Sequence, residues 1–239
     1  MEERNIRHYD FDSGYASAGL TLNEYIARTF GWMFAGLLAT FAVAAALSIS
    51  GYVAYLFFIP YALPAVTIAE LVVVFIFSLG IRNRSVAATR VLFFVYAILN
   101  GVVFSAYFVL FELYSLFVIF GLTALFFGGF ALYGRFSKAD LSRLRPLLLG
   151  GLIFLVIAGL LSIFVFSDRL ERIICMVGIV VFLCFTAFDV QKIKANYEYF
   201  YGNGELLQKA SIFSALQLYL DFVNLFLYLL RFFGRSSRR

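Results

Sequence analysis

Three carboxylates lie inside strongly apolar segments of this chain or at the end of one: Glu70, Asp189 and Asp221. A charge at the middle of a bilayer costs about 2.5–3.5 kcal/mol on the insertion scale, so such residues usually have a partner or a function. Two carboxylates in contact cannot both ionise easily, so Asp189 and Asp221 would share a proton and titrate as a unit if they met. With Asn224 nearby, their oxygens would also suit a transient contact with a hard cation such as Ca²⁺.

Two of these acids also have a plain structural explanation. Asp189 could be a helix-end acid that pairs with Lys192, three residues later. Glu70 could be the structural partner of an arginine. The chain lengths between the two aspartates and the turn that separates them imply a depth difference of roughly 9 Å at 1.5 Å per residue. A tilt or a helix break could close that difference.

The last apolar segment, residues 212–231, positions Asp221. Its polar residues advance by three and four positions and therefore form one stripe along a helix. They are Ser214, Gln217, Asp221, Asn224, Tyr228 and Arg231. In lipid, such a stripe must face protein or a wet cavity. We therefore expect a central helix shielded by others, with Gln217, Asn224 and Ser214 as candidates for lining a pore.

The composition identifies the class of protein. Of 239 residues, 63% are hydrophobic and 14% are charged, and the mean hydropathy is +0.93. A soluble domain of this size could not bury so much apolar surface, so the chain is predicted to be an integral membrane protein. Its net charge of +5 comes from Lys and Arg in short loops, where they set topology, and does not indicate a nucleic-acid partner. The single histidine, His8, lies in the polar N-terminus, which argues against a histidine-based metal or catalytic site.

Seven apolar segments predict an all-α membrane protein with seven transmembrane helices, six of which surround the polar-striped seventh. The predicted spans are 29–49, 62–81, 91–111, 113–133, 146–166, 173–188 and 212–230. They form a transmembrane domain at residues 29–231, between a tail at 1–28 and a basic tail at 232–239. The sixth span has 16 residues and reaches roughly 24 Å, short of the ~30 Å hydrocarbon core. Asp189, the next residue, should therefore be drawn inside the membrane boundary.

The distribution of Lys and Arg predicts the orientation. Thirteen of them lie in the N-terminal tail and the even-numbered loops, against two in the odd-numbered loops. This bias places the N-terminus in the cytoplasm. Seven crossings would then put the arginine-rich C-terminal tail outside, against the same rule. Either the last helix does not fully cross the membrane, or the internal helices determine the orientation despite the positive charge of the short tail. We favour seven crossings because residues 212–230 are long enough.

Three stretches resemble the Bax inhibitor-1 family, and most closely its bacterial inner-membrane branch. They are LTLNEYIARTFGWMFAGLL near the start, FTAFDVQKIK around Asp189 and SALQLYLDFVNLFLYLLRFFG at the end. The resemblance covers about residues 21–234, and LYLDFVNLF is its most specific part. It implies six helices around a central seventh and a pH-dependent Ca²⁺ leak through a multi-pass protein. Ca²⁺ would be the transported ion and protons the regulator, with no cofactor. In eukaryotes the family is associated with suppression of cell death.

The resemblance also implies roles for particular residues. The paired aspartates of the family fall on Asp189 and Asp221. A basic residue that ends the second helix and exchanges partners with the pair maps most nearly onto Arg82. An acid in the second helix that pairs with an arginine ending the seventh maps onto Glu70 and Arg231. The chain departs from the common Tyr-Asp-Thr-Gln pattern by having Phe-Asp-Val-Gln around Asp189, so a hydroxyl that could tune the pair is absent.

Two other functions compete with a leak. Aspartates in consecutive helices are also found in intramembrane aspartyl proteases, but those have Gly-x-Gly before the second aspartate. Here Leu218-Tyr219-Leu220 precedes it, and no Pro-Ala-Leu motif follows the pair. We therefore do not expect an enzyme. The second alternative is a non-conducting scaffold that regulates stress or cell-death responses through protein partners that the sequence does not identify.

Overall fold

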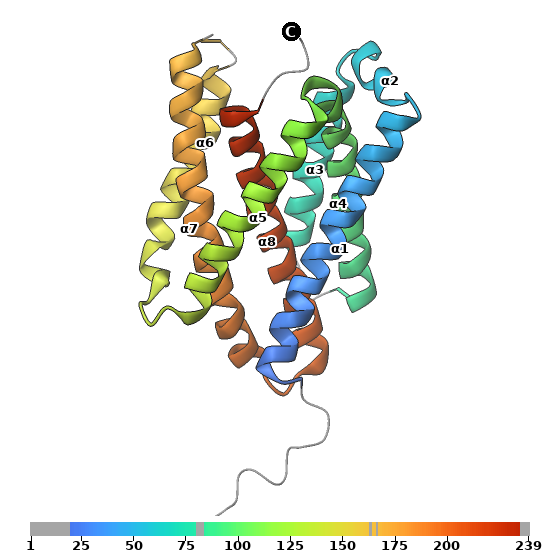
Figure 1. Cartoon of the computed structure of the whole chain (residues 1–239). Helices are drawn as coiled ribbons and strands as arrows, with labels where there is room; N and C mark the ends of the chain where they lie inside the picture. The colour runs from blue at the N-terminus through green and yellow to red at the C-terminus, as the bar shows by residue number, and fades with distance from the viewer. Residues whose placement is uncertain (1–19, 80–83, 163, 166, 235–239) are drawn as a thin grey trace, which may run out of the picture.

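The chain folds into helices, and no strand occurs in the part of it that the structure describes. This computed structural model describes residues 20–79, 84–162, 164–165 and 167–234 (Figure 1). The all-α prediction is confirmed. The helices are α1 (Leu22–Ile49), α2 (Val53–Phe58), α3 (Ala62–Ser78), α4 (Val86–Leu110), α5 (Leu113–Phe136), α6 (Arg145–Ser162), α7 (Asp168–Phe200) and α8 (Gly204–Phe233), with a 3₁₀ turn, Leu141–Leu144, before α6.

Six of the described helices are long and apolar enough to cross a membrane: α1, α4, α5, α6 with its 3₁₀ turn, α7 and α8. This confirms the prediction of a multi-pass membrane protein. The predicted count of seven depends on α3, which has 17 residues and reaches about 26 Å at 1.5 Å per residue.

The first helix begins earlier than the predicted first span. A capping box starts it, in which the Thr21 hydroxyl accepts a hydrogen bond from the Glu24 amide at 3.3 Å and the Glu24 carboxylate accepts one from the Thr21 amide at 2.9 Å. The helix therefore starts at Leu22, seven residues before the apolar run. Part of the predicted N-terminal tail is thus helical, while residues 1–19 and 235–239 lie outside the described residues.

The sixth apolar run is the middle of a much longer helix. Ser167 caps α7, because its hydroxyl accepts a hydrogen bond from the Leu170 amide at 3.4 Å, and the helix continues for 33 residues. At 1.5 Å per residue this is about 50 Å, which exceeds the ~30 Å hydrocarbon core. Asp189 lies inside α7 and not at its end, so the explanation of Asp189 as a helix-end acid is wrong. Likewise, Asn203 caps α8, which begins at Gly204, eight residues before the predicted start of the last span.

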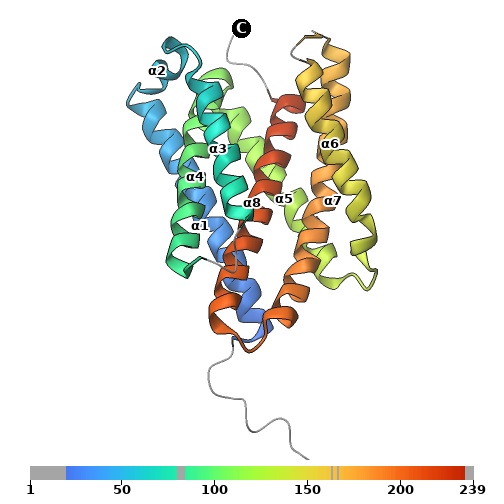
Figure 2. The same cartoon turned by 180° about the vertical axis from the view of Figure 1, so that it is seen from behind.

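Helix α8 is the most extensively buried of the six candidate membrane spans. In both views it stands between a group formed by α1, α3 and α4 and a group formed by α6 and α7 (Figures 1 and 2). Its main packing partners are α1, α4, α5 and α7. Figure 2 shows α8 between α3 and α6 with no helix drawn in front of it. Four helices, rather than the predicted six, therefore supply the main packing around α8.

Small residues let α1, α4 and α8 approach closely. A Cβ added at Gly101 of α4 would lie 2.7 Å from the Thr40 carbonyl oxygen, so only glycine fits there. At this close approach the Thr40 hydroxyl lies 2.6 Å from the Tyr219 hydroxyl and donates to the Ala97 carbonyl at 2.9 Å. These contacts join three helices at the level of the middle of α8.

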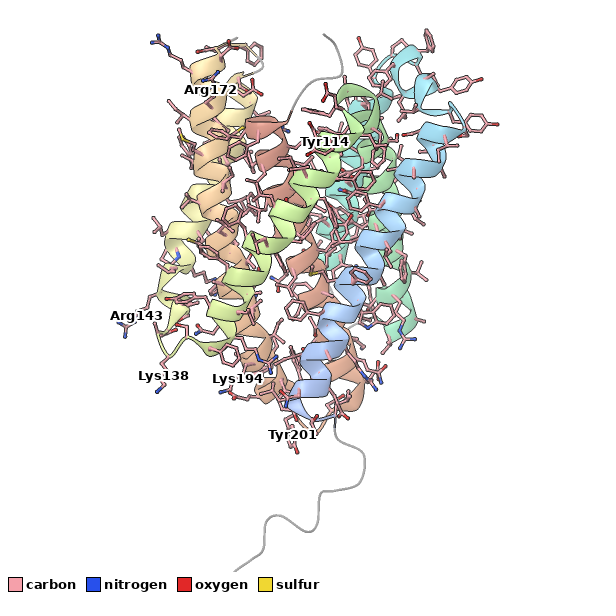
Figure 3. All side chains as sticks on the ribbon, in the orientation of Figure 1. Tyr114, Lys138, Arg143, Arg172, Lys194 and Tyr201 are labelled. Atoms are coloured by element: carbon pink, nitrogen blue, oxygen red, sulfur yellow. The ribbon has the colours of Figure 1, made fainter. Side chains whose placement is uncertain are left out.

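The two ends of the bundle differ in charge. Helix α1 begins at one end and α8 finishes at the other (Figure 1). The labelled side chains of Lys138, Arg143 and Lys194 lie at the end where α1 begins, and Arg172 lies at the opposite end (Figure 3). The uneven distribution of basic residues along the sequence thus becomes an uneven distribution between the two ends of the molecule.

Candidate functional site

A cavity of about 400 Å³ lies between α6, α7 and α8, and both aspartates line it. Helix α6 contributes an apolar wall, and α7 and α8 contribute the polar groups. The lining residues are Leu152, Leu155, Val156, Phe182, Phe185, Asp189, Gln217, Leu220, Asp221, Asn224 and Tyr228. The structure therefore brings together the two acids that the sequence analysis paired.

Asp221 is the more deeply buried of the two acids, with 4% of its surface exposed. Its Oδ2 atom is buried and has no hydrogen-bond partner among the described residues. A buried acceptor without a partner is costly, so its presence in the middle of α8 is a strong indication of a functional role. Asp189 lines the same cavity, so a charge on either carboxylate disfavours a charge on the other.

Asp189 is 7% exposed and faces the same cavity from α7. Lys192, one turn later, attracts both carboxylates. It forms no ion pair within 4 Å in the described chain, and its ammonium lies 6.0 Å from the centre of the Phe188 ring. A direct Asp189–Lys192 salt bridge is therefore absent here. Arg82, the predicted alternative partner, lies outside the described residues.

The predicted polar stripe of α8 divides into three parts. Gln217, Asn224 and Tyr228 are half-buried and line the cavity beside Asp221. Ser214 lies outside the cavity lining, because its hydroxyl is buried against α7 and accepts a hydrogen bond from the Asn196 amide at 3.1 Å. Arg231, the last residue of the stripe, is exposed in the final turn of α8. Two of the three pore-lining candidates thus reach the cavity.

Glu70 forms part of a second polar cluster, between α3 and α4. It is 8% exposed and lies beside the Asn100 side chain. The Asn100 amide donates to the Tyr96 hydroxyl at 3.4 Å. Glu70 Oε1 and Asn100 Oδ1 are both buried without a hydrogen-bond partner in the described chain. Sequence reasoning missed the role of Asn100, although an asparagine inside an apolar segment was the available signal.

The predicted lock between Glu70 and Arg231 is not formed. Three ion pairs occur in the described chain and none joins these residues. Arg231 instead lies 5.9 Å from the Tyr228 ring centre and beside Tyr107. Glu70 lies in the cluster with Asn100 and Tyr96, and the Tyr96 ring is 5.7 Å from that of Tyr219. Tyr219 is twelve residues from Arg231 and so roughly 18 Å away along α8. The two charges lie at different depths, which explains why they do not meet.

The cavity does not have the ligand set of a permanent calcium site. No group of three or more His, Cys, Asp or Glu side chains that could hold a metal occurs among residues 20–79, 84–162, 164–165 and 167–234. Ca²⁺ prefers six to eight oxygen ligands, and two carboxylates with nearby amides supply fewer. This donor set suits brief contact with a passing cation.

Comparison with known proteins gives relatives over most of the chain. The family described as "Inhibitor of apoptosis-promoting Bax1" matches residues 22–238. The chain is 39% identical over 215 residues to a protein of Escherichia coli (strain K12) named "Inner membrane protein YbhL", covering 89% of this chain and 92% of that protein. An uncharacterized protein of Rickettsia prowazekii is 37% identical over 89% of this chain and 90% of its own length. An uncharacterized membrane protein of Streptococcus pyogenes is 29% identical over 93% of this chain and 97% of its own length.

Proposed function

Because the chain belongs to the Bax inhibitor-1 family of membrane proteins, we propose that it is a pH-sensitive cation leak channel with Ca²⁺ as its transported ion. Asp189 and Asp221 are the proton sensor that controls the leak. The observation that carries this proposal is that both acids are buried and line one cavity of about 400 Å³. Burial without a direct cation partner makes a bound proton the simplest way to reduce the charge of the pair.

The topology proposed for this channel has seven crossings, with α3 as the short one, around a central α8. The N-terminus is cytoplasmic and the membrane is a bacterial inner membrane, as in the name of the Escherichia coli relative. Two features support it. Helix α1 begins and α8 finishes at opposite ends of the bundle (Figure 1), as an odd number of crossings requires. Basic side chains gather at the end where α1 begins (Figure 3).

Two contacts around the pair support the proposal that this arrangement is the closed one. Toward the end where α1 begins, the Asn196–Ser214 hydrogen bond joins α7 to α8. Gly134 of α5 packs directly on the Ala187 backbone, two residues before Asp189. A shared proton would hold the two carboxylates together across the cavity. Its loss leaves two like charges, which favours a different arrangement of the helices and a basic partner such as Arg82.

The test is Ca²⁺ flux into liposomes that contain the purified full chain, measured across a range of pH. Asp189→Asn and Asp221→Asn should each flatten the pH dependence, because each removes one of the two groups that share the proton. The two variants need not change the flux in the same direction, since one acid can act mainly in closure and the other mainly as a cation ligand. Asp168→Asn, an exposed aspartate at the start of α7, is the matched control and should keep the wild-type profile.

Two outcomes would contradict the proposal. If both cavity variants keep the wild-type pH profile, Asp189 and Asp221 are not the sensor. If the wild-type protein gives no flux at any pH, the non-conducting scaffold becomes the better explanation. A peptide substrate included in the same liposomes tests the protease alternative. That alternative requires the peptide to be cleaved, and the cleavage to be lost in the Asp189 and Asp221 variants.

A further inference from the structure

A second cavity, of about 250 Å³, lies at the end of the bundle where α1 begins, between α1, α4 and α8. It is separate from the cavity that holds the aspartates, because the two share no lining residue. Two arginines, a glutamine and a tryptophan line it together with apolar side chains. The lining residues are Leu20, Tyr25, Arg28, Trp32, Arg90, Leu207, Gln208, Ser211 and Ile212.

Arg90 is held in a defined orientation at this cavity. Its guanidinium lies 5.5 Å from the centre of the Trp32 ring, and its Nη2 atom donates to Gln208 Oε1 at 3.3 Å. These contacts come from α1 and α8, while Arg90 itself is on α4. A guanidinium carries five N–H donors, and the described chain supplies no carboxylate within 4 Å of this one. Most of its donors thus remain available for an acceptor from outside the described chain.

Arg28 adds a second cation on the same face of α1, one turn before Trp32. Glu24 lies one turn before it on α1, and no ion pair within 4 Å joins the two. The Glu24 carboxylate is already engaged by the Thr21 amide at 2.9 Å. The cavity therefore has two arginines and an excess of donors, with no carboxylate among its lining residues.

The position of the cavity indicates where its ligand comes from. It lies at the basic end of the bundle, beside a tryptophan, which is a residue typical of the membrane–water interface. Its remaining walls are apolar, including Leu20, Leu207 and Ile212, so they can take hydrocarbon next to a charged group. Basic cavities between transmembrane helices at this depth match the headgroups of anionic lipids.

We propose that Arg28, Arg90 and Gln208 bind the phosphate of an anionic phospholipid, with Trp32 and the leucines against its glycerol and upper acyl chains. Guanidinium groups bind phosphate through paired, charge-assisted hydrogen bonds. A lipid held there contacts three helices at once and therefore stabilises the folded bundle in proportion to its occupancy. This proposal does not depend on the leak function, because it uses neither the aspartates nor their cavity.

The experiment measures binding to the full chain in micelles of a neutral detergent. Phosphatidylglycerol is added as the probe, with phosphatidylcholine and inorganic phosphate as separate arms. Trp32 is the single tryptophan of the chain, so its fluorescence reports the cavity directly, and the thermal unfolding midpoint gives a second readout. Phosphatidylglycerol should change the Trp32 signal and raise the midpoint, whereas phosphatidylcholine at the same concentration should do neither.

Variants make the test specific. Arg28→Gln and Arg90→Gln should each weaken the affinity for phosphatidylglycerol about tenfold, as expected for the loss of one charge-assisted contact. Arg143→Gln is the matched control, because Arg143 lies at the same end of the bundle on an exposed side chain away from the cavity. Arg90→Lys keeps the charge but loses the paired geometry, so it should fall between the wild type and Arg90→Gln. It also covers the case in which Arg90→Gln does not fold.

Three results would overturn the proposal. Equal weakening by Arg143→Gln would show general attraction of an anionic lipid to a basic end. An equal response to phosphatidylcholine would show that the site does not select for the net negative charge of the lipid. Saturation by inorganic phosphate alone, with no further effect of the lipid, would make this a site for free phosphate and not for a lipid. Failure of any of these tests leaves the pH dependence of Ca²⁺ flux unaffected, so the two proposals fail separately.

Discussion

The two sides of α8 are built in opposite ways. Toward α1 and α4, Tyr219 is completely buried, and its hydroxyl lies 2.6 Å from that of Thr40. The rings of Phe93 and Tyr96 stand edge-on to the Tyr219 ring, at 6.1 and 5.7 Å. Toward α6 and α7, the same helix borders a cavity of about 400 Å³. There Asp221 has a buried oxygen without a hydrogen-bond partner in the described chain.

The difference shows which side of α8 can change its arrangement. Close-packed interiors have few alternative arrangements, because each shift opens voids or creates overlaps. The side toward α1 and α4 combines that packing with a satisfied hydroxyl pair, so it fixes α8 in place. The cavity side has free volume and an unsatisfied acid, so a change in protonation can be accommodated there. The gate proposed above is therefore expected at the cavity between α6, α7 and α8.

The largest effect is expected from truncating a fully buried side chain of α8, in comparison with a side chain that lines the cavity. Leu218→Ala should lower the free energy of unfolding by about 2–5 kcal/mol, because Leu218 is fully buried and its removal leaves a void. Leu220→Ala, which enlarges a cavity that already exists, should cost clearly less. Denaturant unfolding in detergent, followed by Trp32 fluorescence, measures both. Equal costs for the two leucines would remove the contrast between packed and cavity-lining positions of α8.

A smaller but still large effect is expected from filling the space at Gly101. Gly101→Ala should cost about 1–3 kcal/mol, because the added Cβ would press on the Thr40 backbone and on Val43. Gly159→Ala in α6 is the control, since nothing lies within 4 Å of a Cβ there. That change should be neutral or stabilise α6 by up to about 1 kcal/mol through helix propensity. If both variants unfold at the same denaturant concentration, α1 and α4 are not closely packed.

Removing one hydroxyl from the packed side should have a moderate effect. Tyr219→Phe should lower the free energy of unfolding by about 0.5–1.5 kcal/mol, because it deletes the buried contact with Thr40. Thr40 keeps its carbonyl acceptors, which limits the loss. Tyr228→Phe, at the edge of the cavity, should cost less in the same assay. A greater loss for Tyr228 would mean that the cavity side contributes more hydrogen-bond energy than the packed side.

The smallest effect is expected at Glu70. Glu70→Gln should change the free energy of unfolding less than any destabilising change above, because no cation lies within 4 Å of Glu70 in the described chain and glutamine keeps its size and one acceptor oxygen. In a double-mutant cycle, Glu70→Gln and Arg231→Gln should be additive. A coupling energy above about 1 kcal/mol would show that the two residues do pair in solution, in a conformation other than this one.

Properties that depend on short stretches of chain were predictable from the sequence. Apolar segments of 16–21 residues identified an all-α membrane protein, because only a helix satisfies its backbone within lipid. The prediction was less accurate at helix ends. The capping residues Thr21 and Asn203 extend α1 and α8 well beyond their apolar runs. The length of an apolar run reflects the thickness of the hydrocarbon core and not the length of the helix. This explains why the predicted spans are shorter than the helices.

Part of the site was also predictable. An aspartate at the centre of an apolar helix is recognisable from the sequence alone, because burying its charge is costly wherever the helix lies. The role of Asn100 beside Glu70 was not recognisable, since the two come from different helices. The Glu70–Arg231 pair was predicted from a resemblance and is absent here, because their relative depth is set by how α3 and α8 pack.

The sequence by itself therefore determined the class of fold, the approximate helices and the burial of Asp221, all of which follow from local composition and periodicity. Only the tertiary structure decided that Asp189 reaches the same cavity as Asp221, and that Arg28 and Arg90 line one cavity with Trp32. The physical reason is that a helix's rotation, tilt and neighbours come from contacts between distant residues. The close approach of Gly101 to Thr40 and the hydrogen bond from Asn196 to Ser214 are such contacts, and no local pattern specifies them.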